Sequence, residues 1–127
     1  MFVQNLNQEQ QIALYKTTEI LISCDGEVTS EELEYLDFLK KQMPSIPEME
    51  FDIASLKALL NTKQSKVSFM LELIAIAYAD EDYHESEVHL ISKIASIIGI
   101  DNHLLNELEN WVVKQTTLLS DAEELME

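Results

Sequence analysis

Apolar residues recur at helical spacing along almost the whole chain, and this spacing limits its fold more than any other feature. No segment sustains the alternation of apolar and polar residues that a half-buried strand requires. The 127 residues include only two glycines and two prolines, so tight turns are few. The sequence therefore predicts an all-α fold, a helical bundle in which each helix buries an apolar face.

Capping residues and breaks divide this pattern into six or seven helices. Asn7 and Gln10 have the spacing of a capping box, and Pro44–Pro47 is the clearest break. Gly99 stands where a left-handed helix C-cap is expected. Ser120 with Glu123 is a further capping box, which allows a short last helix. We expect helices at about 8–23, 30–43, 52–60, 63–78, 85–98 and 102–119.

The chain also contains an internal repeat. After a shift of 55 residues, segment 20–33 lies over segment 75–88, and in both copies an apolar helix runs into an aspartate followed by a short acidic loop. A second helix then begins, with a glutamate seven residues after that aspartate. We therefore predict a single domain over 1–127, built from two pseudo-twofold helix–acidic loop–helix halves at about 8–43 and 63–98.

The helical period places four carboxylates towards the core side of the bundle. At about 100° per residue, Glu87 lies within about 40° of each member of the apolar stripe that follows it, Ile91, Ile94 and Ile98. Glu32 stands in the same way against the apolar stripe of its own helix. Asp25 and Asp80 each follow apolar residues three and four positions earlier. All four side chains are expected where helix ends meet.

These four carboxylates predict a metal site. An ionised carboxylate in apolar surroundings is costly unless it is paired with a cation or bound to a metal, and neither acidic loop contains a lysine. Oxygen-only ligands favour a hard ion, Ca²⁺ or Mg²⁺, over Zn²⁺. The alternative is that each glutamate caps the N-terminus of its own helix. The predicted ligands are Asp25, Glu32, Asp80 and Glu87, with Glu27 and Asp82 added from the loops.

Two segments resemble the TerB-like (tellurite-resistance protein B) family. One is Asp25-Gly26-Glu27-Val28 followed by Glu31-Glu32, and the other runs from Leu73 through Asp80 and Glu87 to Ile98-Gly99-Ile100. The resemblance covers roughly residues 8–119, and Glu81 stands where the second motif expects glycine. It implies an all-helical, pseudo-twofold fold of metal-binding acidic character, a link to bacterial tellurite resistance and chemical stress, and no established catalysis. It also implies that Asp25 pairs with Glu32 and Asp80 with Glu87.

Other metal and catalytic patterns fit less well. His84 and His89 are five residues apart, or about 140° on a helix, so they do not form the zinc site of an HExxH protease. The loop from Asp80 lacks the glycine and the final glutamate of an EF-hand. His84 could still join the acidic site and shift it towards Zn²⁺, although a solvent-facing or capping role is simpler. Cys24 and Trp111 are expected in the core.

Charge excludes several functions. The chain has 24 acidic residues, 8 lysines, no arginine and a net charge of −16, which argues against nucleic acid and anionic membranes. The longest apolar run, 73–79, is too short to cross a membrane. A lone cysteine and an N-terminus without a signal-peptide pattern predict a cytoplasmic protein. The carboxylates suit metal ions or a basic partner, unless they serve solubility alone.

Three functions follow from these patterns. The first is a non-catalytic, metal-binding helical module in a bacterial tellurite or chemical stress response. The second is a protein-interaction adaptor whose acidic surface docks a protein partner with a basic surface. The third is a metal-dependent enzyme, which would need an open coordination position and a substrate cleft. The sequence favours the first and predicts no enzyme.

Overall fold

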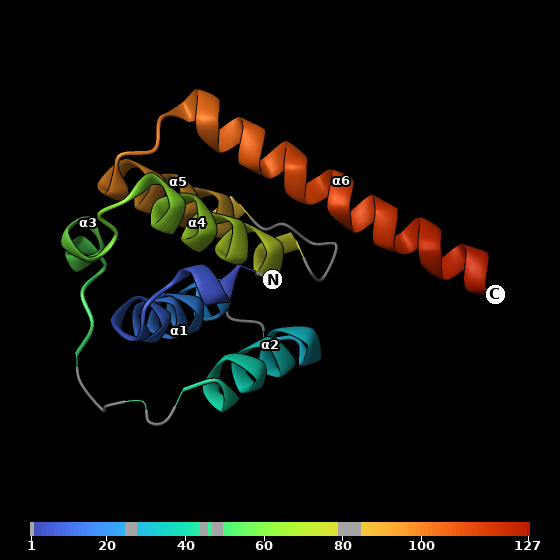
Figure 1. Cartoon of the computed structure of the whole chain (residues 1–127), viewed down its shortest axis with the longest axis horizontal. Coiled ribbons are helices and arrows are strands. Elements are labelled where there is room, and N and C mark those ends of the chain that lie inside the picture. Colours follow the sequence, from blue (N-terminus) through green and yellow to red (C-terminus); the bar gives the residue numbers. More distant parts are fainter. Residues whose placement is uncertain (1, 25–27, 44–45, 47–49, 79–84) are drawn as a thin grey trace.

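The computed structural model describes residues 2–24, 28–43, 46, 50–78 and 85–127. Within these residues the fold is all-helical, as the sequence predicts, and no strand is present (Figure 1). The elements in chain order are η1 (Val3–Asn5), α1 (Gln8–Ser23), α2 (Ser30–Lys41), η2 (Ile53–Ser55), α3 (Leu56–Leu59), α4 (Lys63–Tyr78), α5 (Glu85–Ile98) and α6 (Asn102–Met126). The η elements are single turns of 3₁₀-helix.

Helix α4 forms the centre of the fold. The helices α1, α5 and α6 and the turn η1 all pack against it (Figure 1). From Phe69 to Ala77 every residue of α4 except Glu72 is apolar, and every one except Ala75 is buried, as expected for a helix that is apolar on almost all sides. Phe69, Met70, Leu73 and Ile74 are accordingly fully buried. The core of the bundle therefore surrounds α4.

Local signals fix most helix ends where the sequence places them. Asn7 accepts a hydrogen bond of 2.8 Å from the backbone N–H of Gln10, whose side chain accepts one of 2.9 Å in return. Directly after α5, Gly99 adopts a positive φ of 87°. The N–H of Ile100 then donates to the carbonyl of Ala95 at 2.8 Å, which completes a Schellman cap. Both predicted caps are confirmed.

Two predicted elements differ in detail. The expected helix at 52–60 is a 3₁₀ turn that continues into the short α3, with the Asp52 side chain capping its start. The expected break at Ser120 is wrong, because α6 continues from Asn102 to Met126 without interruption. No glycine or proline lies in this stretch, so nothing forces the chain out of the helix. A capping-box sequence is also compatible with a helix interior.

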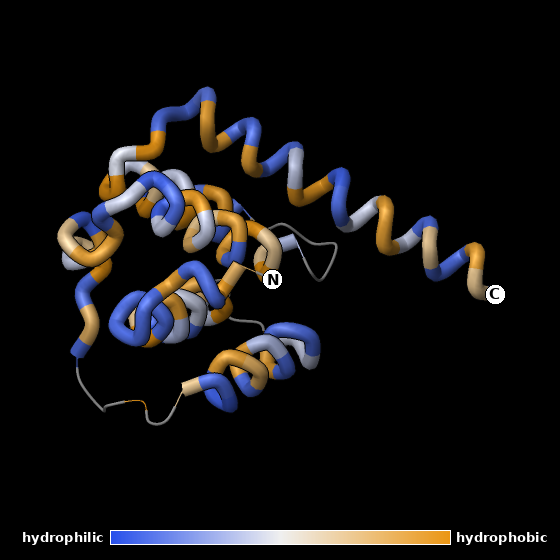
Figure 2. The backbone as a smooth tube through the Cα atoms, in the orientation of Figure 1, coloured by the Kyte–Doolittle hydropathy of each residue, from blue (hydrophilic) through white to orange (hydrophobic). Residues whose placement is uncertain are grey.

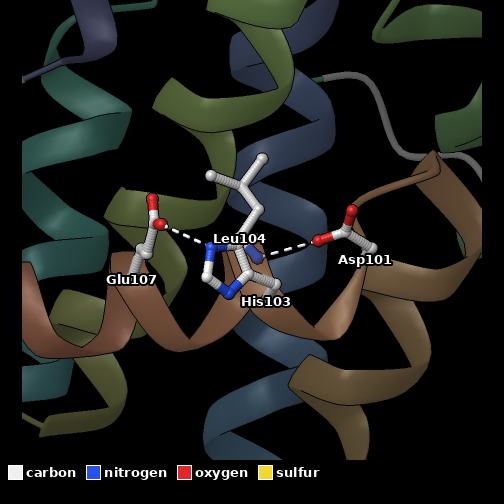
Figure 3. A network of polar contacts seen from close by, with 4 residues as sticks. All are labelled: Asp101, His103, Leu104 and Glu107. Carbon is white, nitrogen blue, oxygen red and sulfur yellow. Dashed lines mark hydrogen bonds and ion pairs between the residues drawn. The ribbon is translucent and has the colours of Figure 1, made fainter.

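Side chains near the N-terminus of α6 stabilise its first turns. Asp101 accepts a hydrogen bond of 2.8 Å from the N–H of Leu104, and His103 contacts Glu107 at 2.8 Å one turn later (Figure 3). His103 is exposed. The Asp101 side chain therefore satisfies one of the free backbone N–H groups at the start of α6.

Two residues predicted in the core are exposed. Trp111 lies at the edge of the bundle, 41% exposed, with its ring packed edge-to-face on Phe2 at a centroid separation of 5.6 Å. The apolar neighbours of Trp111 on α6 face α4, whereas Trp111 covers the N-terminal segment. Cys24 is also exposed, because it follows the last turn of α1 rather than lying on its buried face. Its thiol donates to the carbonyl of Leu21 at 3.0 Å.

None of the helices in the described ranges has the length and apolar character of a membrane span. The predicted single domain over 1–127 and the cytoplasmic location stay predictions.

Candidate metal site

The structure describes two of the six predicted metal ligands. Glu32 and Glu87 lie on α2 and α5, whereas Asp25, Glu27, Asp80 and Asp82 fall outside the described residues, as does His84. Within the described part of the chain, no three His, Cys, Asp or Glu side chains gather closely enough to hold a metal ion. A metal site built on the predicted ligands would therefore need the loop carboxylates.

Glu32 is buried at the start of α2, with 3% of its surface exposed. Its Oε1 accepts a hydrogen bond of 2.9 Å from the backbone N–H of Thr29. The N–H of Glu32 in turn donates to the hydroxyl of Thr29 at 3.2 Å, so the two residues form a capping box. Glu32 therefore caps the N-terminus of its own helix through Oε1, as the alternative to a metal site predicts.

Glu87 is buried at the start of α5, with 2% of its surface exposed. It is the third residue of α5, as Glu32 is the third residue of α2. One turn and more along α5, Ile91, Ile94 and Ile98 are buried on the same face. The helical period therefore placed both glutamates correctly on the buried side of their helices. The neighbouring residues Glu31, Glu34, Glu85 and His89 are exposed to solvent.

The helix bounds repeat with the shift found in the sequence. Helices α1 and α4 both contain 16 residues, and their first and last residues differ in number by 55. The first residues of α2 and α5 also differ by 55. Each half therefore ends one helix and begins the next at equivalent positions. The pseudo-twofold placement of the two halves in space stays a prediction.

A third buried glutamate was missed by the sequence analysis. Glu72 on α4 is 4% exposed, and it accepts hydrogen bonds of 2.6 Å from the backbone N–H of Phe2 and from the hydroxyl of Tyr35. Burial raises the pKa of the Tyr35 hydroxyl well above its usual range, and the nearby Glu72 charge raises it further. Glu72 joins the N-terminal segment, α2 and α4.

One signal in the sequence could have identified Glu72. It lies between Leu71 and Leu73 in the long apolar run of α4, where most positions are expected to be buried. The repeat gave no hint, because Thr17 stands at the equivalent position in the first half. The Thr17 hydroxyl is satisfied inside its own helix by the carbonyl of Ala13 at 2.7 Å.

Lysine does not neutralise Glu32. Among the described residues no ion pair reaches this carboxylate, and no hydrogen bond reaches its Oε2. The ion pair that α2 does contain, between Lys41 and Asp37, is exposed and lies at the other end of the helix. A buried carboxylate oxygen at the edge of an acidic loop is the kind of ligand that a hard cation binds.

Comparison with known proteins identifies a family. The family model described as tellurite resistance protein TerB matches residues 39–110, which is more than half of the chain. The match includes the second acidic motif with Glu87 and begins after the first motif with Glu32, so it is shorter than the expected 8–119. No curated protein and no solved structure matches the chain.

Proposed function

Because the chain belongs to the TerB family, we propose that it is a non-catalytic helical module that binds a divalent metal ion through its two acidic loops. The observation that carries this proposal is the matched burial of Glu32 and Glu87. Each is the third residue of a helix that follows an acidic loop, and each is almost wholly removed from solvent. The tellurite or chemical stress response is the proposed setting.

Burial of the Glu32 carboxylate, which no lysine of the described residues reaches, supports a cation beside it. Burying an ionised carboxylate away from water costs roughly several kcal/mol. Proteins offset this cost with a neighbouring cation or a bound metal ion. The chain has only 8 lysines for 24 acidic residues. One divalent metal ion can neutralise several neighbouring carboxylates at once. The eight lysines are spread over the sequence and are less suited to this.

The donor chemistry favours a hard ion. The residues that would hold it offer carboxylate oxygens, which suit Ca²⁺ or Mg²⁺ better than Zn²⁺. Capping and metal binding are compatible at Glu32, because a carboxylate has two oxygens and Thr29 occupies only Oε1. When bound, the ion would supply positive charge to the loop between two helices. The proposed ligands are Asp25, Glu27, Glu32, Asp80, Asp82 and Glu87.

Native mass spectrometry with and without a chelator tests this function. The wild type, exposed to calcium, magnesium or zinc and then desalted, should retain an ion that the chelator removes. A variant with Asp25→Asn and Asp80→Asn should lose it. A control with Glu31→Gln and Glu85→Gln removes the same charge from exposed neighbours and should retain the ion. Equal retention in all three proteins, or no retained ion in any, would contradict the proposal.

A further inference from the structure

The second half of α6 lies beyond the rest of the bundle. Val112 is the last buried residue of the helix, and α6 continues for 14 residues to Met126, about 21 Å at the helical rise (Figure 1). We call residues 113–126 the distal segment. Its large apolar residues are the most exposed in the described chain: Leu118, Leu119, Leu125 and Met126 are between 60% and 88% exposed.

These apolar residues form one stripe along the helix. Measured from Leu118 at about 100° per residue, Leu125 lies at about −20°, Ala122 at about 40°, Met126 at about 80° and Leu119 at about 100°. The stripe is therefore about 120° wide, which is the width that a helix buries against a neighbour. Figure 2 shows apolar and polar residues alternating with the helical turn along the distal segment.

The stripe continues the buried face of the same helix. In the first half of α6, Leu105, Leu108 and Val112 are buried, and α4 is the main neighbour of this helix. Leu108 lies about 80° from Leu118, Val112 about 120° and Leu105 about 140°, so the buried face adjoins the stripe at its Leu119 edge and overlaps it at Leu108. The α4 helix ends at Tyr78, whose hydroxyl contacts Glu109 at 3.5 Å. The last residue of α4 therefore contacts α6 nine residues before Leu118.

Charge decides what can cover this stripe. Asp121 and Glu123 lie about 40° beyond its two edges, and Glu124 lies on the opposite face. The distal segment carries three carboxylates against one lysine, Lys114, which lies about 20° beyond the Leu125 edge on the side of Asp121, on a chain of net charge −16. A second copy of the chain would bring two such acidic rims together, which is unfavourable. A helix whose own apolar stripe has lysines or arginines at its rims would meet opposite charges on both sides.

We propose that the distal segment of α6 is a docking site for an amphipathic, basic-rimmed helix of another protein. An exposed apolar stripe of this size rimmed by charge marks an interaction surface. Helix recognition through apolar residues at every third and fourth position is a common mode of binding. The docked helix buries Leu118 and Leu125 at the centre, and its cations pair with Asp121 and Glu123 at the rims. This inference does not depend on metal binding.

A synthetic peptide tests the proposal. The probe is a fluorescently labelled helical peptide with leucines on one face and lysines at both rims, and its anisotropy is measured against the full chain. Two control peptides keep the length: one replaces the lysines with glutamates, and the other scatters the leucines around the helix. The variant Leu118→Gln with Leu125→Gln removes the stripe at unchanged charge. Thr117→Gln is the matched control, an exposed position on the polar side of the same segment.

The wild type and Thr117→Gln should bind the probe, and the double glutamine variant should bind it at least about tenfold more weakly. Both control peptides should also bind about tenfold more weakly or not at all. Circular dichroism melts should show all three proteins equally folded, since the changed side chains lie in solvent.

Four results would overturn the proposal. The first is equal binding of the probe to all variants, which means that charge alone attracts it. The second is a concentration-dependent dimer in sedimentation velocity that the double glutamine variant abolishes, which assigns the stripe to a second copy. The third is failure to bind the probe together with stripe-dependent binding to zwitterionic phosphatidylcholine vesicles, which assigns it to a lipid surface. Absence of binding to peptide, vesicle and second copy alike would also contradict it.

Discussion

The hydroxyl of Tyr35 donates a hydrogen bond of 2.6 Å to Oε2 of Glu72, and this contact joins α2 to the central helix α4. The other oxygen of Glu72 accepts from the backbone N–H of Phe2 at 2.6 Å. One buried carboxylate therefore holds three segments that are far apart in the sequence. Hydrogen bonds to a charged group are stronger than neutral ones, so this contact is a sensitive point of the fold.

Replacing Tyr35 with phenylalanine should lower the free energy of unfolding by about 1.5–3 kcal/mol, because it removes a hydrogen bond to a buried charge. Chemical denaturation followed by circular dichroism measures the change. Tyr15→Phe is the matched control. Tyr15 lies on α1 and makes no hydroxyl hydrogen bond among the described residues, so its replacement should change stability by less than about 0.5 kcal/mol. Equal effects of the two substitutions would contradict the role given to Tyr35.

The same tyrosine predicts a loss of stability in alkali. Burial, with the charge of Glu72 next, raises the pKa of Tyr35 in the folded state above the value of about 10 in the unfolded chain. Above pH 10 the unfolded chain therefore binds fewer protons than the folded one, and the free energy of unfolding falls as pH rises. The stabilising effect is fully present below pH 10. Chemical denaturation between pH 8 and 11 measures the free energy of unfolding of the wild type and of Tyr35→Phe. The difference between the two free energies should become smaller above about pH 10. A constant difference would contradict this linkage.

Gly99 should resist replacement for reasons of backbone conformation. Its φ of 87° is in the left-handed region, while an added Cβ would meet only the end of Lys66 at 3.8 Å. Gly99→Ala should therefore destabilise the fold by about 1–2 kcal/mol through strain and not through a clash. Gly99→Asn should cost less, because asparagine tolerates this conformation. Thermal melts compare the two, and an alanine variant as stable as wild type would show that the cap is not needed.

The helices could be predicted because their signals are local. Asn7, Thr29 and Asp101 cap their helices with side chains three residues from their partners, and Gly99 ends α5 within its own turn. The buried sides of Glu32 and Glu87 followed from the helical period alone. Such features need no knowledge of what packs against the helix.

The remaining features depend on neighbours that are distant in the sequence. Trp111 belongs to an apolar pattern, but whether it is covered depends on the N-terminal Phe2, and α4 covers only the first half of α6. In the sequence, Glu72 is a single acidic residue in an apolar helix. Only the structure shows that Tyr35 and Phe2 donate hydrogen bonds to it. Local pattern cannot decide which residue of an exposed helix face finds a partner.

Glutamine at the two matched positions should separate metal binding from capping. If Glu32 and Glu87 bind an ion, Glu32→Gln and Glu87→Gln should leave the metal-free protein equally or more stable and remove most of the rise in melting temperature with calcium. If they only cap, each change should cost up to about 1 kcal/mol with or without metal. Thermal melts in calcium and in chelator measure both effects. Glu31→Gln and Glu85→Gln are the exposed controls and should keep the full rise.

Isothermal titration calorimetry of calcium and magnesium into the chelator-treated protein tests the central proposal most directly. The proposal predicts saturable binding at pH 7 that weakens as the pH falls towards 4, because carboxylates must be ionised to bind the ion. It also predicts that Asp25→Asn with Asp80→Asn abolishes the heat of binding while Glu31→Gln with Glu85→Gln retains it. Titrations of the wild type that show no binding of calcium, magnesium or zinc at pH 7 would contradict it.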